Sequence, residues 1–396
     1  MTGNTDVIVI GGGYAGVMAA SRLTRRDDVT VTLINPRPRF VDRIRLHQLV
    51  AGSHDAVLDF ERVLGERVRL TVDTVTRIDA AERRVTLAGG DTIDYDHLIY
   101  AVGSGSAAPG VPGAAEFAYP LAGLEEAQRL RQALDAAPAT AAVTVVGAGP
   151  TGIETAAELG ELGRAVTLVC GGVLGPYLHP RGRRSVAGRL AALGVTVLEG
   201  PGARVTAVTA DEVRLGDGRA LPSEVTVWTA GFGVPGLAAR SGLATDAAGR
   251  MLTDETLTSV DDPRIVAAGD SAAPSGLPYR MSCQAAVQLG PQAAETVLSR
   301  IAGERPAPVR VGFAGQCISL GRRAGIFQFA RMNDTAVGLY VAGRAGGRLK
   351  ELICEGIIAQ QVAHEARKPG SRSWWGKDGT RPLLLEAHHG RPLPTH

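Results

Sequence analysis

The strongest constraint on this chain of 396 residues is a short pattern that occurs twice. In VIVIGGGYAG, residues 7–16, a run of β-branched residues breaks into glycines and continues into an alanine-rich segment. VTVVGAGPTG, residues 143–152, repeats the pattern, and a second apolar run follows each copy, at 29–35 and at 165–170. Short continuous apolar runs are typical of strands buried on both faces of a parallel sheet, so each copy predicts a strand–helix–strand unit. The chain therefore contains a duplicated domain.

The glycines of both turns have the spacing G-x-G-x-x-G. The first glycine permits the tight turn, the second lets a pyrophosphate approach the backbone, and the third lets the helix pack closely on the strand. A phosphate then lies on the free N–H groups at the helix N-terminus. The glycines are Gly11, Gly13 and Gly16 in the first copy and Gly147, Gly149 and Gly152 in the second. The predicted fold class is α/β, with two Rossmann-like dinucleotide-binding domains.

Two dinucleotide sites in one chain suit one dinucleotide that stays bound and another that exchanges. FAD in the first site and NAD(P)H in the second form the economical pair, because hydride passes from nicotinamide to flavin and the flavin electrons then move on. We therefore predict an oxidoreductase with FAD and NAD(P)H as cofactors.

Further motifs match one family of flavoproteins. AVGSGS at 101–106 and TAGFG at 229–233 match its two recurrent strand-end turns, and RIVAAGD at 264–270 matches its flavin-closing Gly-Asp. CQAAVQ at 283–288 matches the signature A-Q-x-A-x-Q, with Cys283 in place of the first alanine. The chain thus resembles the pyridine nucleotide oxidoreductases with two dinucleotide-binding folds, and in particular the type II (alternative) NADH:quinone oxidoreductases.

The resemblance implies roles for individual residues. Asp270 would hydrogen-bond the ribityl chain of FAD, and Gly103, in the first strand-end turn, would also contact the cofactor. Glu154 would lie near the junction of nicotinamide and flavin. Gln284 and Gln288 would lie beside the quinone-facing side of the flavin. The implied partner is a quinone-like small molecule that accepts electrons.

The same patterns give the expected domain boundaries. We expect a discontinuous FAD-binding domain at 1–110 and 240–305 and an NAD(P)H-binding domain at 111–239. A smaller C-terminal α+β region at 306–396 begins within a proline-rich stretch.

Two positions depart from the expected pattern. Each unit should end its second strand with an acid that binds a ribose hydroxyl, but the first ends in Asn35 and the second in Cys170. Asn35 can still hydrogen-bond the ribose of FAD. Cys170 does not repel the 2′-phosphate of NADPH, so the choice between NADH and NADPH stays open, as does loss of the nicotinamide site. Three arginines nearby either pair with a phosphate or form a solvated helix face: Arg181, Arg183 and Arg184.

The segment 39–52 is expected to pass near the flavin and the acceptor. His47 and Arg45 are candidates for polarising or protonating an acceptor oxygen, although a packed histidine would give the same sequence. Cys283 is either a redox-active thiol at the flavin edge or a small buried apolar residue. No cysteine precedes Cys170, which excludes the C-x4-C pair of disulfide reductases, and the scattered cysteines and histidines predict no metal site.

Charge and hydropathy limit the kinds of binding partner and the cellular locations that we expect. The net charge of +2, with both signs dispersed, argues against a nucleic-acid partner. Without a signal-peptide pattern or an apolar run of about 20 residues, we expect a cytoplasmic protein. An apolar stripe followed by Trp374-Trp375 fits peripheral contact with the inner face of a membrane, but it fits better a helix packed on the core or in a homodimer. The stripe consists of Leu352, Ile353, Ile357, Ile358 and Val362.

Together these features predict an FAD-dependent enzyme that takes hydride from NAD(P)H and passes electrons to a quinone-like acceptor. Its expected catalytic residues are Glu154, Gln284, Gln288 and His47. Two alternatives use the same flavin. One is a biosynthetic oxidoreductase that modifies a specific small molecule or peptide. The other is a non-enzymatic redox sensor that binds FAD and NAD(P)H and changes conformation on reduction.

Overall fold

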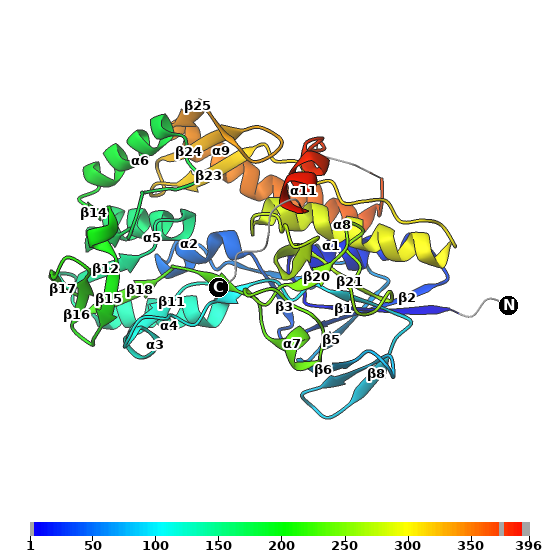
Figure 1. Cartoon of the computed structure of the whole chain (residues 1–396). Coiled ribbons are helices and arrows are strands. Elements are labelled where there is room, and N and C mark those ends of the chain that lie inside the picture. The colour runs from blue at the N-terminus through cyan, green and yellow to red at the C-terminus, as the bar shows by residue number, and fades with distance from the viewer. Residues whose placement is uncertain (1–3, 372–375, 390–396) are drawn as a thin grey trace.

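The structure is a computed structural model that describes residues 4–371 and 376–389 (Figure 1). Its two main sheets are each five-stranded and parallel, which confirms the predicted α/β class. The first sheet has the order β21-β9-β1-β2-β5, so a late strand joins strands from the start of the chain. Its strands are β1 (Thr5–Ile10), β2 (Val29–Asn35), β5 (Val68–Val72), β9 (His97–Tyr100) and β21 (Ile265–Ala267).

The second sheet repeats the arrangement with the order β11-β18-β12-β13-β14. The first two strands of each unit pair in the same parallel way, Thr5 opposite Val29 and Ala142 opposite Ala165. The apolar runs that predicted these strands are buried in the two halves of the molecule. The strands are β11 (Ala118–Pro120), β12 (Ala142–Val146), β13 (Ala165–Val169), β14 (Thr196–Leu198) and β18 (Val225–Trp228).

Helices follow the glycine turns in both halves. In the first half, α1 (Tyr14–Leu23) and α8 (Cys283–Ile301) lie side by side on one face of the sheet (Figure 1). Gly290 permits this packing, because a Cβ there would lie 2.2 Å from the carbonyl oxygen of Ala15. In the second half, α5 (Pro150–Glu161) follows β12, and α6 (Pro180–Ala192) follows β13.

Antiparallel ribbons and short helices complete the two halves. Two three-stranded ribbons are β6 (Val75–Asp79), β7 (Arg84–Leu87) and β8 (Thr92–Asp94), and β15 (Val205–Val208), β16 (Glu212–Leu215) and β17 (Ala220–Pro222). The two predicted strand-end turns pair with each other through β10 (Gly105–Ser106) and β19 (Phe232–Gly233). Further strands and helices of the two halves are β3 (Arg39–Val41), α2 (Leu46–Val50), β4 (Val57–Asp59), α3 (Ala114–Phe117), α4 (Leu124–Ala136), α7 (Leu237–Arg240), β20 (Met251–Thr253) and β22 (Ala272–Pro274).

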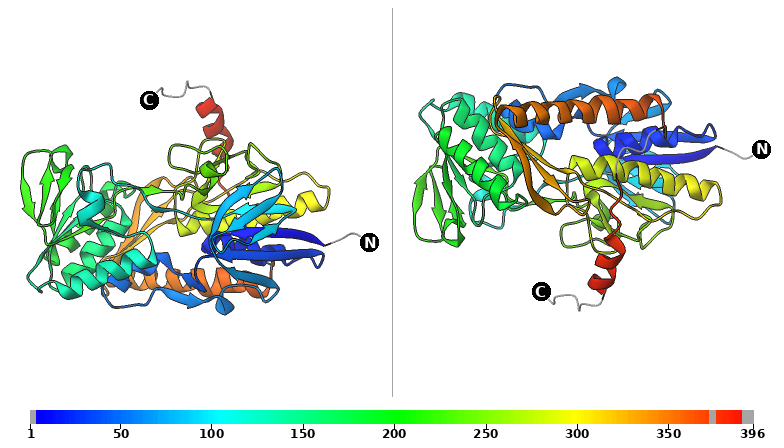
Figure 2. Two further views of the ribbon diagram at one scale, coloured as in Figure 1. Left: turned by 90° about the horizontal axis from the view of Figure 1, so that it is seen from below. Right: turned by 90° about the horizontal axis from the view of Figure 1, so that it is seen from above.

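The C-terminal region connects the two halves. An antiparallel sheet of β23 (Gly315–Ser319), β24 (Gly325–Ala330) and β25 (Ala336–Ala342) precedes α9 (Gly343–Gly356). The chain continues as a π-helical segment (Ile357–Val362), α10 (Ala363–Arg367) and, further on, α11 (Arg381–His389). β23 packs against α5 of the second half, whereas α10 packs against α1 of the first. Figure 2 shows this region lying along both halves.

The apolar stripe at the C-terminus packs mainly on the protein core. Ile357 and Val362 are buried in the core of the first half, and Ile353 and Ile358 pack against it. Leu352 is 65% exposed. The predicted Trp374-Trp375 contact lies outside the described residues.

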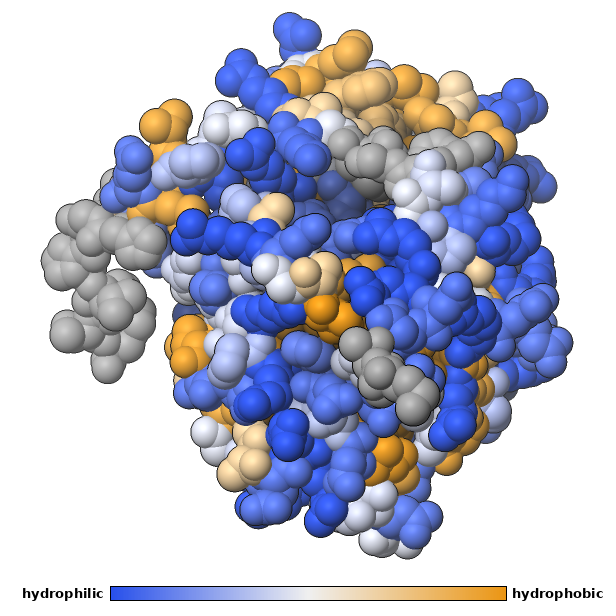
Figure 3. Space-filling view, turned by 90° about the vertical axis from the view of Figure 1, so that its right-hand side faces the viewer, coloured by the Kyte–Doolittle hydropathy of each residue, from blue (hydrophilic) through white to orange (hydrophobic). Residues whose placement is uncertain are grey.

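The described residues give no sign of a membrane span. Within 4–371 and 376–389, no helix is both long enough and apolar enough to cross a bilayer. The face that carries the N-terminal end of the first sheet is mostly hydrophilic, with apolar patches separated by polar side chains (Figure 3). Contact with a membrane surface stays a prediction.

Candidate active site between the two nucleotide-binding halves

The first glycine turn is packed tightly against the protein at Gly11 and Gly16 and has open space at Gly13. Gly11 has a φ of +102°, and a Cβ there would lie 2.4 Å from the carbonyl oxygen of Ala101. A Cβ on Gly16 would lie 1.8 Å from the carbonyl oxygen of Gly11. Around Gly13, the N-cap of α1, a Cβ would meet no atom within 4 Å, and no side chain caps the helix. The space and the exposed N–H groups fit a pyrophosphate.

The second glycine turn has the same shape. Gly147 has a φ of +135°, and a Cβ there would lie 2.3 Å from Oγ1 of Thr229. A Cβ on Gly152 would lie 2.1 Å from the carbonyl oxygen of Gly147, while Gly149 again has open space. The N-terminus of α5 has no side-chain cap. The chain thus presents two separate phosphate cradles, and the residues present fit the two expected dinucleotides.

The two residues that replace the expected strand-end acids behave differently. Asn35 is buried, its Oδ1 accepts the Gly12 N–H at 2.9 Å, and its amide nitrogen donates to the Arg37 carbonyl at 2.8 Å. Asn35 therefore holds the first glycine turn in place. Cys170 is half-buried, and burial together with the charge of Glu199 raises the pKa of its thiol to about 12. Its side chain is neutral at physiological pH.

A cluster of polar residues lies at the predicted flavin edge, where α8 begins. Ser104 donates from Oγ to Oδ2 of Asp270 at 2.6 Å, and the backbone N–H of Ser282, the N-cap of α8, donates to the other carboxylate oxygen at 3.2 Å. Nη1 of Arg43 lies 3.2 Å from Oγ of Ser104 and 3.9 Å from Asp270. Gly103, with φ +71°, turns the chain beside this guanidinium. Arg43 and Ser104 join the predicted Gly103 and Asp270.

The two signature glutamines bind the protein backbone. Gln288 donates to the carbonyl oxygens of Gln284 and Gly312 and accepts the Gly312 N–H at 3.1 Å. The amide of Gln284, oriented to satisfy both of its ends, pairs with Ala314 N at 3.2 Å and Gly315 O at 3.1 Å. Both side chains therefore fasten the segment 312–315 to α8. Their predicted contact with an acceptor stays a prediction.

A buried cluster brings His47 and Glu154 together where the three parts of the chain meet. His47 lies on α2, Glu154 on α5, Ser319 on β23 and Lys350 on α9. Lys350 Nζ lies 2.9 Å from Oε1 of Glu154, which also accepts the Ser319 N–H at 3.0 Å. Oγ of Ser319 lies 2.9 Å from Nε2 of His47, and Nδ1 of His47 lies 3.5 Å from Oε2 of Glu154. All four residues are buried.

The charges of this cluster follow from burial and pairing. Burial lowers the pKa of His47 to about 4, so its imidazole is neutral at pH 7. Burial acts to lower the pKa of Lys350 too, but the Glu154 carboxylate, together with smaller effects of Cys317 and Cys354, raises this pKa well above its ordinary value. Burial acts to raise the pKa of Glu154, and the neighbouring His47, the Lys350 charge and the Ser319 N–H bring it below its usual range. The cluster thus holds one ion pair and one neutral imidazole.

Further ion pairs surround the cluster. Nε of Arg322 donates to Oε1 of Glu158 at 2.7 Å, and its Nη1 lies 3.3 Å from Glu351. Nη1 of Arg45 donates to Glu351 at 2.8 Å, so the predicted candidate Arg45 is held in an ion pair. Burial acts to raise the pKa of Glu158, and it remains raised although Arg322 opposes the shift.

Sequence reasoning missed most of the C-terminal contribution to this site. The missed residues are Ser319, Arg322, Lys350 and Glu351. One signal was present in the sequence, because Lys350 is one of three lysines among 42 basic residues and is followed closely by apolar side chains. Cys283, by contrast, is a protonated thiol, since burial raises its pKa.

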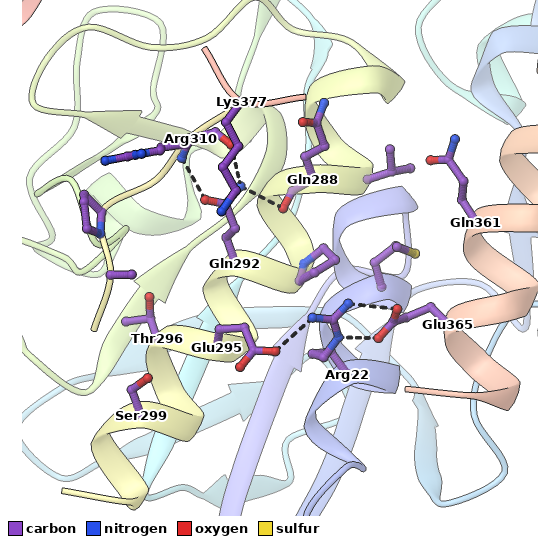
Figure 4. Close-up of a pocket in the computed structure, with 15 residues that line it drawn as sticks. Arg22, Gln288, Gln292, Glu295, Thr296, Ser299, Arg310, Gln361, Glu365 and Lys377 are labelled. Carbon is purple, nitrogen blue, oxygen red and sulfur yellow. Dashed lines mark hydrogen bonds and ion pairs between the residues drawn. The ribbon is translucent and has the colours of Figure 1, made fainter. Parts of the chain in front are cut away.

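A cavity of about 500 Å³ lies between α1, α8 and the segment 307–310 (Figure 4). Gln288 and Gln292 line one wall, and Arg22 lies between Glu295, at 2.8 Å, and Glu365. This volume is in the range of small-molecule sites. Of the four predicted catalytic residues, only Gln288 lines the cavity, so the cavity and the buried cluster are separate features.

Comparisons with known proteins agree with this geometry. The family model of the pyridine nucleotide-disulphide oxidoreductases matches residues 5–290. An NADH dehydrogenase-like protein of Mycobacterium tuberculosis is 32% identical over 82% of this chain and 87% of its own length. The type II NADH:quinone oxidoreductase Ndh of the same species is 30% identical, covering 76% of this chain and 74% of its own. NDH2 from Plasmodium falciparum, solved with NADH, shares the fold, with a TM-score of 0.75 at 15% identity over 95% and 99% of the two chains.

These matches confirm the predicted oxidoreductase class and the resemblance to type II NADH:quinone oxidoreductases, and they imply FAD and NAD(P)H as the cofactors. The match covers well over half of the chain, including both glycine turns and the start of α8. The chain belongs to the pyridine nucleotide-disulphide oxidoreductase family.

Proposed function

We propose that the chain oxidises a nicotinamide nucleotide and passes the electrons through FAD to a quinone-like acceptor. The observation that carries this proposal is the pair of glycine turns with the same open shape, one in each half. A chain that transfers hydride between two dinucleotides needs two such cradles. The M. tuberculosis relative named a type II NADH:quinone oxidoreductase supports the quinone as acceptor.

We assign one cofactor to each half. FAD would lie on the first turn, with Asn35 near its ribose and with Gly103 and Asp270 at its ribityl chain. The nicotinamide nucleotide would lie on the second turn, with Cys170 at its ribose and Glu154 toward the flavin. FAD, when bound, supplies hydride acceptance and onward electron transfer. The N-terminus of α8 turns its positive end toward Asp270 and stabilises negative charge there.

Reduction of a quinone also consumes protons, and the buried cluster can hold and move one. Oγ of Ser319 lies 2.9 Å from Nε2 of His47 and 3.3 Å from Oε1 of Glu154. A proton can pass between the imidazole and the carboxylate through this hydroxyl. Lys350 keeps Glu154 ionised, so the carboxylate is a weak base that passes a proton on and does not retain it. Glu154 and His47 are therefore our candidates for proton transfer.

The proposed subcellular location follows from the nature of the electron acceptor. A quinone dissolved in lipid requires contact with a membrane surface, so we place the chain in the cytoplasm and peripherally on the inner face of the membrane. The exposed Leu352 on α9 would serve such a contact, or the contact of a homodimer. Flotation with vesicles and the mass of the chain in solution distinguish these two arrangements.

Anaerobic titration tests the whole proposal. NADH or NADPH should bleach the yellow flavin of the purified protein, and menadione should then restore the colour. If neither nucleotide bleaches it, the donor is wrong. If bleaching is fast and quinones do not restore the colour, the acceptor is wrong and a biosynthetic role gains support. A reduced complex that persists and reoxidises slowly would support a redox sensor.

A further inference from the structure

The nicotinamide half lacks an acid at the end of its second strand, but the neighbouring strand supplies one. β13 ends at Val169, and Cys170, where the acid is expected, carries no charge. β14 runs parallel beside it, and Glu199 directly follows the end of β14. Because the carboxyl ends of parallel strands lie at one edge of a sheet, Glu199 lies at the same edge as Cys170.

Backbone hydrogen bonds fasten the two strand ends together. The Cys170 N–H donates to the Leu198 carbonyl at 2.9 Å, and the Gly200 N–H donates to the Gly172 carbonyl at 2.7 Å. Between these bonds, Oε1 of Glu199 accepts the Leu174 N–H at 2.7 Å. The carboxylate therefore has a fixed position over the loop 170–175.

The same loop reaches the phosphate cradle. The N–H of Gly175 donates to the carbonyl of Ala148, inside the second glycine turn, at 2.9 Å. Leu174, which holds the Glu199 carboxylate, is the preceding residue. The charge of Glu199 is thus one residue along the loop from the turn that would hold the pyrophosphate, where the adjoining ribose belongs.

We infer that Glu199 takes the place of the missing strand-end acid and makes the second site selective for NADH over NADPH. The inference rests on the proposed nicotinamide site. Oε2 of Glu199 makes no hydrogen bond or ion pair with any residue in the described ranges and is free to accept a ribose hydroxyl. A 2′-phosphate in the same place would meet a negative charge.

Arg204 lies near this edge of the sheet and its charge can oppose this effect. A Cβ on Gly171 would lie 3.7 Å from Cα of Arg204, and the Arg204 side chain is exposed. A free guanidinium can attract a 2′-phosphate. The carboxylate is hydrogen-bonded into place, whereas the Arg204 guanidinium makes no such bond with a described residue. We therefore expect Glu199 to decide the preference.

Calorimetric binding of ADP-ribose and of its 2′-phosphate to the FAD-loaded protein tests the inference without turnover. The wild-type chain should bind ADP-ribose at least tenfold more tightly than it binds the 2′-phosphate of ADP-ribose. Glu199→Gln keeps an oxygen for the Leu174 N–H but removes the charge, so it should bring the two dissociation constants within about threefold of each other. The matched control is Glu224→Gln, since Glu224 also accepts a backbone N–H, that of Ala142 at 2.6 Å, but at the opposite end of this sheet.

The outcomes distinguish a failure of the proposed role of Glu199 from a failure of the proposed nicotinamide site. Equal binding of both ligands by the wild-type chain, or an unchanged ratio in Glu199→Gln, overturns the role of Glu199 and leaves the proposed function standing. Failure of the wild-type chain to bind either ligand overturns the nicotinamide site itself. A loss of selectivity in Glu224→Gln as well would show that the effect is not local to Glu199.

Discussion

At the scale of single residues, burial decides which groups carry charge. His47 is 3% exposed, and Ser319 is the hydrogen-bond partner of its Nε2. Glu154 and Lys350 are buried as well, yet they stay ionised because each is paired with the other. A neutral imidazole beside a charged pair suits a group that exchanges a proton. The same arrangement makes stability depend on pH.

The lowered pKa of His47 should make the chain less stable in acid. In the unfolded chain the imidazole takes up a proton near pH 6.5, whereas in the folded chain it does so only near pH 4. Between these values the unfolded state binds more protons, so the free energy of unfolding falls as the pH falls, by about 3 kcal/mol across the window. Urea midpoints from pH 4.5 to 7 should show this slope, and His47→Gln should flatten it. Equal slopes in both proteins would contradict a buried neutral His47.

At the scale of elements, each glycine turn packs closely against neighbouring backbone on its protein side and has open space on the side where a dinucleotide would bind. The clash behind the turn explains Gly11 and Gly16, and the open space explains Gly13. Because Gly149 has the same open space as Gly13, the two positions form a matched pair.

Alanine at these two positions should separate the cofactors. Gly13→Ala should fold, since the added Cβ meets no protein atom, but it should purify without flavin because the Cβ occupies the pyrophosphate position. The Gly149→Ala protein should keep its yellow FAD and bind ADP-ribose at least tenfold more weakly than the wild-type chain. Visible absorbance, circular dichroism and calorimetry measure these effects. Gly16→Ala, with its Cβ 1.8 Å from a carbonyl oxygen, should fail to fold. A yellow Gly13→Ala protein would contradict the FAD site.

The elements also show where sequence reasoning stops. Both strand–turn–helix units could be predicted because buried parallel strands and glycine turns leave patterns within about 30 residues. The π-helical segment at Ile357–Val362 leaves no such pattern, and the five-residue spacing of the stripe reads as an imperfect α-helix. The contact between Gln288 and the Gly312 backbone could not be predicted either, because Gly312 lies in the irregular segment before β23 and reaches α8 only through tertiary packing.

At the scale of the whole molecule, the buried cluster joins three parts of the chain. His47 comes from the first half, Glu154 from the second, and Ser319 and Lys350 from the C-terminal region. Residues so far apart in sequence are brought together only by the complete fold, which is why Glu154 and His47 could be singled out from local motifs but their partners could not. The resemblance to a family supplied Glu154, and nothing comparable supplied Lys350.

The Lys350–Glu154 pair should stabilise the entire chain rather than one part of it. Lys350→Met leaves a carboxylate buried without its partner, which costs about 3–5 kcal/mol. The double variant Lys350→Met with Glu154→Met should regain most of that loss, because a buried apolar pair needs no charge compensation. Lys368→Met, at an exposed lysine, is the matched control and should change little. The pair joins the C-terminal region to the second half, and Glu154 and Ser319 contact His47 of the first half. Urea midpoints followed by flavin release and by far-UV circular dichroism should therefore fall together in Lys350→Met. A fall in only one signal would mean that the cluster holds a single half, and no recovery in the double variant would mean that the lost packing of Lys350, not the unpaired charge, weakens the fold.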